Sequence, residues 1–139
     1  MIRNYLALIC GIFLSFLLVG VAGFILANFK IPPFYEFMIG NSRNFFEPDS
    51  RLLEEMMYID IFVTFPIITF TTGLISGLIA KRKEYLIGII SIIPLFIIFN
   101  IYSFSINSIY TCISFLISVV FGVFISKSLK KKVNEKSKR

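Results

Sequence analysis

Two groups of side chains in this 139-residue chain have types and spacing that could support chemistry. The first is Asp60, which directly precedes a long apolar stretch, with Lys30 and Arg51 as basic residues in the segment before it. Such a carboxylate could face the interior of a helix bundle and form an outer vestibule with one of these basic partners, since ionisable groups at membrane depth usually face an interior or a water-filled cavity. The alternative is a carboxylate that only reaches the lipid–water interface.

The second group is the threonine-rich, proline-interrupted stretch T64-F-P-I-I-T-F-T-T72. Pro66 frees a backbone carbonyl one turn earlier, and threonine hydroxyls can satisfy it while the helix kinks. Pro94 lies inside another apolar stretch. Interrupted helices carry substrate sites in transporters, but we favour a static kink whose hydroxyls bond back to their own helix. The candidates for a polar lining are Thr64, Thr69, Thr71 and Thr72.

Side chains that carry most catalysis and metal binding are scarce in this chain. It has no histidine, which removes the commonest general base and metal ligand. Two cysteines, Cys10 and Cys112, cannot build a structural zinc site, and we expect them at different depths, too far apart for a disulfide. No phosphate-cradling glycine loop or nucleophile elbow is present. We therefore predict a protein that is not an enzyme and has no cofactor or metal site.

Three long uncharged runs identify the elements that would position these groups. Residues 4–29, 61–80 and 85–126 contain no charged side chain. About 20 apolar residues cross a bilayer core, so the longest run must turn back once, and its polar patch at residues 100–108 is the predicted turn. The sequence therefore predicts an all-α polytopic membrane protein, a small bundle with four transmembrane helices. The spans are expected at about residues 5–28, 59–80, 85–101 and 107–126.

Small residues at helical spacing predict the faces through which these spans make contact. In lipid, small side chains let helix backbones approach closely, and packing replaces the hydrophobic drive of water. We favour packing within one bundle, with a dimer seam as the alternative. The residues concerned are Gly11 and Ser15 in the first span, Gly73 and Gly77 in the second, and Ser114, Ser118 and Gly122 in the fourth.

The distribution of lysine and arginine predicts the orientation. Eleven of the fourteen basic residues lie at position 3, in the 81–83 turn or in the tail 127–139. By the positive-inside rule, both termini and that turn are cytoplasmic in an integral plasma (inner) membrane protein. The basic tail directly follows a span and contains no aromatic residue. It is expected to touch anionic lipid, or alternatively an acidic partner, rather than nucleic acid.

The segment 29–58 is the predicted outer cap between the first two spans. It contains most of the chain's acidic residues and is longer than a simple connection requires. We therefore expect it to recognise a partner outside the membrane; the alternative is a loop that merely joins the two spans. The leading hypothesis is a non-enzymatic accessory or assembly subunit that acts through helix contacts and its outer loop, with a membrane protein as partner. The alternative is a small transporter or channel, a homo-oligomer with a path along the kinked second and third spans.

Overall fold

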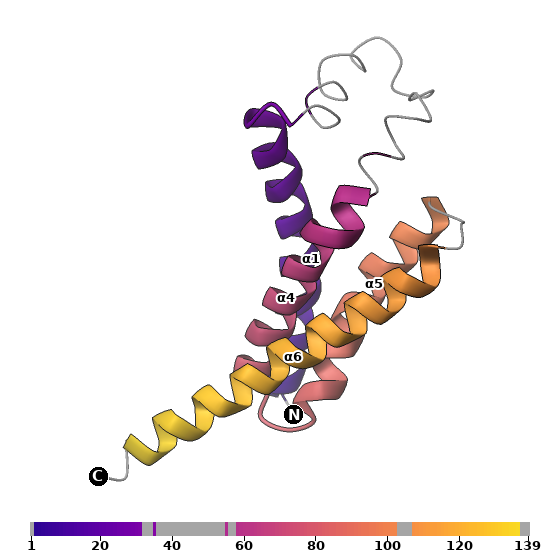
Figure 1. Cartoon of the computed structure of the whole chain (residues 1–139). Coiled ribbons are helices and arrows are strands. Elements are labelled where there is room, and N and C mark those ends of the chain that lie inside the picture. Colours follow the sequence, from indigo (N-terminus) through magenta and orange to yellow (C-terminus); the bar gives the residue numbers. More distant parts are fainter. Residues whose placement is uncertain (1, 32–34, 36–54, 56–57, 103–106, 137–139) are drawn as a thin grey trace.

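The computed structural model describes residues 2–31, 35, 55, 58–102 and 107–136, and the regular structure within them is helical throughout. The described residues form four α-helices: α1 (Ile2–Asn28), α4 (Phe65–Ile79), α5 (Glu84–Tyr102) and α6 (Asn107–Lys136) (Figure 1). A π-helical turn, η1 (Asp60–Thr64), leads directly into α4. The predicted all-α class is confirmed for these residues. Arg51, most of the predicted outer cap 29–58, the middle of the predicted turn 100–108 and the last residues of the tail lie outside the described residues.

Among the described residues, three helical segments are long and apolar enough to cross a bilayer: Ile2–Asn28, Asp60–Ile79 and Thr111–Glu135. They fall on the first, second and fourth predicted spans. The third predicted span lies within α5, whose segment Glu84–Ile98 is apolar but shorter. At a rise of 1.5 Å per residue, α1 extends for about 40 Å, which exceeds a hydrocarbon core of about 30 Å. In length and composition these helices are compatible with a membrane protein.

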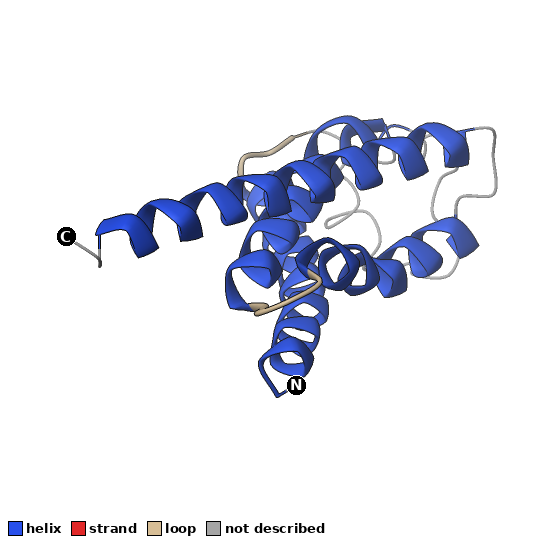
Figure 2. Cartoon of the chain, turned by 90° about the horizontal axis from the view of Figure 1, so that it is seen from below, coloured by secondary structure: helices blue, strands red, loops and turns tan. Residues whose placement is uncertain are grey.

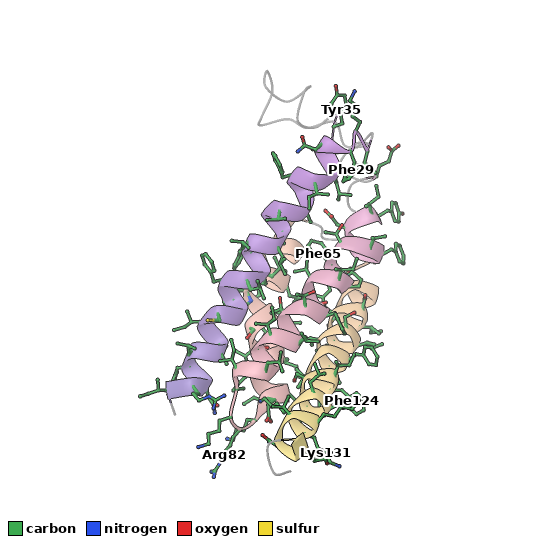
Figure 3. All side chains as sticks on the ribbon, turned by 90° about the vertical axis from the view of Figure 1, so that its left-hand side faces the viewer. Phe29, Tyr35, Phe65, Arg82, Phe124 and Lys131 are labelled. Carbon is green, nitrogen blue, oxygen red and sulfur yellow. The ribbon has the colours of Figure 1, made fainter. Side chains whose placement is uncertain are left out.

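The helices alternate in direction, so the N-terminus, the 80–83 turn and the C-terminal part of α6 lie at one end of the molecule (Figure 1). We call this end, defined by Asn4 and residues 80–83 and 127–131, the basic end. The opposite end, where α1 stops and η1 starts, is the loop end. Figure 3 shows Arg82 and Lys131 at the basic end and Phe29 at the loop end.

Helix α4 contacts each of the other three α-helices, while α1 packs on α4 and α5, and α6 packs on the same pair from another side. Helix α6 crosses the others obliquely. Seen from below, its C-terminal turns project beyond the rest of the molecule (Figure 2). The central position of α4 explains why its buried residues are more numerous than those of α1.

The interior has apolar clusters at its two ends. At the basic end, Ala7, Ala80 and Ile87 are buried together. At the loop end, the ring of Phe115 on α6 meets Phe65 on α4 edge to face, with centroids 5.2 Å apart, and Phe96 on α5 at 5.8 Å. Edge-to-face pairs of this kind stabilise beyond the area that they bury. The buried members of the loop-end cluster are Phe65, Ile68, Ile92, Leu95, Phe115 and Val119.

The π-helical turn has a physical reason in Pro66. Inside an α-helix, a proline ring clashes with the carbonyl group four residues earlier, which here belongs to Phe62. Directly before Pro66 the backbone widens, and the amide of Phe65 bonds the carbonyl of Asp60 five residues back. By contrast, α5 remains α-helical through Pro94.

Candidate functional site

Asp60 is the half-buried first residue of η1, at the loop end. The hydroxyl group of Thr64, one turn further on, donates a hydrogen bond to its carboxylate. Lys30 is exposed, and no ion pair between Lys30 and Asp60 is found among the described residues. Of the predicted vestibule residues, the structure therefore places Asp60 with Thr64 instead of Lys30, and Arg51 lies outside the described part.

Lys30 ends α1 in a Schellman motif. Its φ angle of 54° is in the left-handed region. Its amide donates a hydrogen bond to the carbonyl of Ala27 at 3.0 Å, and the amide of Ile31 donates one to the carbonyl of Leu26 at 3.1 Å. These two bonds satisfy carbonyl groups that a helix end leaves open. The backbone of Lys30 thus has a structural role that the sequence pattern does not reveal.

The four candidate threonines divide between two faces of the second span. Thr69 and Thr72 are fully buried in the bundle. Thr64 and Thr71 instead line a cavity of about 250 Å³ between α1 and the η1–α4 helix. The other walls of this cavity are aliphatic and come from the same two segments: Leu18, Val21, Ala22, Ile25, Leu26, Val63, Ile67 and Ile68. The threonines therefore do not form a common lining between the second and third spans.

Most buried hydroxyl groups bond back to their own helix. Thr69 donates to the carbonyl of Phe65 at 2.8 Å, and Thr71 donates to that of Ile67 at the same distance. Ser15, Ser91 and Ser126 do the same on α1, α5 and α6, each at 2.7 Å. Neither threonine bonds the carbonyl of Phe62, four residues before Pro66. Within the described part of the chain, the hydroxyl of Thr72 is the buried side-chain group without a hydrogen-bond partner.

Small residues lie where helices approach most closely. A methyl group added at Gly11 would lie 2.5 Å from the Ser91 hydroxyl of α5. Additions at Gly73 and Gly122 would overlap backbone carbonyl groups of the facing helix, those of Val119 and Phe70 respectively. Gly77 faces the side-chain hydroxyl of Ser126, and Ser15 is fully buried. These contacts connect α1 with α5 and α4 with α6.

The predicted stripe on α6 is rotated in the structure. Gly122 is buried, but Ser114 and Ser118 are only half-buried. The buried face of α6 instead contains bulkier side chains beside the glycine. Its fully covered residues include Phe115, Val119, Val123 and Ser126.

Sequence reasoning missed a charged group at the basic end. Glu84, the first residue of α5, lies 3.8 Å from the ammonium nitrogen of Lys127 and 3.7 Å from that of Lys130. Lys130 also donates to the carbonyl of Ala80, the residue that ends α4. The ammonium group of Lys127 lies 4.4 Å from the ring centroid of Tyr85, in a cation–π arrangement.

These lysines line a cavity of about 340 Å³, whose walls are Glu84, Lys127, Lys130, Lys131, Asn134 and Glu135. The α6 members follow the i, i+3, i+4, i+7 spacing of one helix face. That spacing is visible in the sequence, and it could have shown that the start of the tail has a defined face.

The described residues bring no three histidine, cysteine or acidic side chains close enough to hold a metal ion. Cys10 and Cys112 are both free thiols, as predicted. The interactions that the described residues do show are close helix packing, a hydrogen bond at Asp60 and electrostatic attraction at the basic end. No family model, no curated protein and no solved structure matches this chain.

Proposed function

We propose that the chain is a four-span integral protein of the plasma (inner) membrane, with both termini and the 80–83 turn in the cytoplasm and the 29–58 loop outside. The alternating helix directions and the collection of lysine and arginine at one end support this topology (Figure 1). Helix α5 has 19 residues and therefore extends for about 28 Å, close to the thickness of a hydrocarbon core. It serves as the third span in this proposal.

Within that topology, the protein acts as an accessory or assembly subunit without enzymatic activity, through its outward helix faces and its outer loop. The observation that carries this proposal is the face of α1 that points away from α4 and α5. Phe13, Phe16 and Phe24 are exposed there, and Gly20 between them has open space where a side chain would stand. Because a glycine framed by large rings admits a side chain of a second helix, this face suits a helical membrane partner.

A transport or channel role has less support. A path along α4 and α5 needs polar groups that face each other across the two helices. The threonines of α4 point to two faces, and the hydroxyls of Thr69 and Ser91 bond to their own helices. Between these two helices, Gly88 of α5 lies in ordinary van der Waals contact with Ser76 of α4: a carbon added at Gly88 would lie 3.6 Å from the Ser76 hydroxyl.

The test is affinity recovery of the tagged full chain in mild detergent, with chemical cross-linking and native mass measurement. The variants are the chain with residues 41–57 scrambled, Gly20→Leu, which fills the open site on α1, and Ile97→Phe as a size-increasing control on an exposed position of α5. We expect the unmodified chain and the control to recover the same second protein in a constant ratio, and the other two variants to lose it.

Two results would contradict the accessory role. If all variants recover the same partner, neither the outer loop nor the α1 face is the contact. If only homo-oligomers are recovered, the chain is not an accessory subunit, and the oligomeric transporter or channel becomes the better proposal.

A further inference from the structure

The cavity at the basic end has unused hydrogen-bond donors. The ammonium groups of Lys127 and Lys130 lie 3.8 and 3.7 Å from Glu84, longer than a direct charge-assisted hydrogen bond of about 2.7–2.9 Å. Each ammonium group carries three donors, and Lys130 uses one of them on the carbonyl of Ala80. Lys131 is exposed and has no ion-pair partner among the residues that the structure describes. Three lysines therefore line one space of about 340 Å³.

An exposed apolar stripe leads to these lysines along α6. Ile113, Ile117, Val120 and Phe124 are between 40% and 64% exposed, and their alternating spacing of four and three residues continues directly to Lys127 and then Lys131. Residues at this spacing lie on one face of a helix. Figure 3 shows Phe124 on the outer side of α6, near Lys131. One helix face thus carries an apolar track with cationic groups at its end.

We propose that the cavity binds the phosphate headgroup of one anionic phospholipid, whose acyl chain lies along this stripe. The site rests on the proposed membrane topology, which places it in the cytoplasmic leaflet. Lys127 and Lys131 donate to the phosphate oxygens, and Lys130 holds α6 against the end of α4. Glu84 competes with the phosphate for the same ammonium groups. The surrounding basic residues, among them Arg82 and Lys132, add a positive field that favours an anionic over a zwitterionic headgroup.

The site can be tested by native mass measurement of the full chain in a non-ionic detergent, titrated with phosphatidylglycerol or phosphatidylcholine. An uncharged micelle adds no surface potential of its own, and the variants below separate the cavity from the diffuse attraction of a basic patch. We expect one phosphatidylglycerol to be retained per chain, and phosphatidylcholine to bind far more weakly. Lys127→Gln combined with Lys131→Gln should weaken retention roughly 30-fold, through the loss of two hydrogen bonds to the phosphate.

The matched control is Lys81→Gln combined with Lys132→Gln, which removes the same charge from exposed positions outside the cavity. It should weaken retention only through the surrounding positive field, and far less than the cavity pair does. Glu84→Gln should tighten binding, because it removes the competing carboxylate; a merely structural role of Glu84 would not produce this gain. Circular dichroism of each variant shows that it is folded.

Three outcomes would overturn the proposal. Equal retention of the two lipids would exclude selection of an anionic headgroup. Equal weakening in the cavity and control variants would show a diffuse basic surface without a site. Displacement of bound phosphatidylglycerol by inorganic phosphate at equal concentration would show that the cavity takes a free anion and that the apolar stripe contributes nothing.

Discussion

The side-chain oxygen of Asn4 accepts a hydrogen bond from the backbone amide of Lys81 at 3.0 Å, across 77 positions of the sequence. The amide of Arg82 approaches the same oxygen at 3.4 Å. The turn after α4 is tight, since Lys83 adopts a φ angle of 56°, and Asn4 satisfies amide groups that this turn exposes. One residue in the first turns of α1 thereby holds the α4–α5 connection at the basic end.

Asn4→Ala should lower the free energy of unfolding by about 0.5–1.5 kcal/mol, the usual net value of an intramolecular hydrogen bond. Asn28→Ala is the matched control, because Asn28 is exposed and bonds the Phe24 carbonyl of its own helix. Reversible unfolding in mixed micelles, followed by circular dichroism, measures both. Equal losses in the two variants would mean that the Asn4 bond does not stabilise the turn.

Gly73→Ala should destabilise the protein by about 1–3 kcal/mol, the cost of inserting a methyl group into a packed interior. The new methyl group would overlap the backbone carbonyl of Val119, and α4 and α6 would have to separate. Gly20→Ala is the control, since no atom lies within 4 Å of its added carbon.

The same unfolding measurement reports both glycine variants. Gly20→Ala should leave stability unchanged or raise it slightly, because alanine favours the helix over glycine. If Gly73→Ala is as stable as Gly20→Ala, then α4 and α6 do not touch at this position.

Lys130→Met should cost about 1–2 kcal/mol. The variant loses a charged hydrogen bond to the Ala80 carbonyl and a partly exposed ion pair with Glu84, and exposed ion pairs alone contribute less than about 1 kcal/mol. Lys132→Met, at an exposed position outside the cavity, should change little. In 1 M salt, the difference in stability between the two variants should fall only by the contribution of the ion pair. If the difference disappears completely in salt, the hydrogen bond to Ala80 contributes nothing.

The helices could be predicted from the sequence because long uncharged runs have few alternatives in lipid. The small-residue pattern also identified Gly73 and Gly77, since close backbone approach requires residues without bulk. The rotated face of α6 could not be predicted in this way: Phe115 packs there because Phe65 and Phe96 leave a matching space. This packing is determined by side chains of α4 and α5, so the spacing of residues within α6 cannot predict it.

The contacts of the basic end were missed for a similar reason. Asn4 and Lys130 form hydrogen bonds with backbone groups that lie 77 and 50 positions away in the sequence. A backbone group has no signature in the sequence. The π-helical turn at Asp60 depends on how the chain relieves the Pro66 clash, for which the sequence allows a kink as readily as a wider turn. The sequence singles out Asp60 as an acidic residue at the start of a predicted span, and its partner among the described residues is Thr64 instead of a basic side chain.

The most direct test of the account is the accessibility of single cysteines in a Cys10→Ser, Cys112→Ser background, probed with a membrane-impermeant maleimide on intact cells. The single sites are Glu55→Cys before η1, Arg82→Cys in the α4–α5 turn and Asn134→Cys in α6. The proposed topology predicts labelling of Glu55→Cys on intact cells, and labelling of Arg82→Cys and Asn134→Cys only after the membrane is opened. Labelling of Arg82→Cys on intact cells, or of Glu55→Cys and Arg82→Cys from the same side, would contradict the proposed passage of the chain through the bilayer.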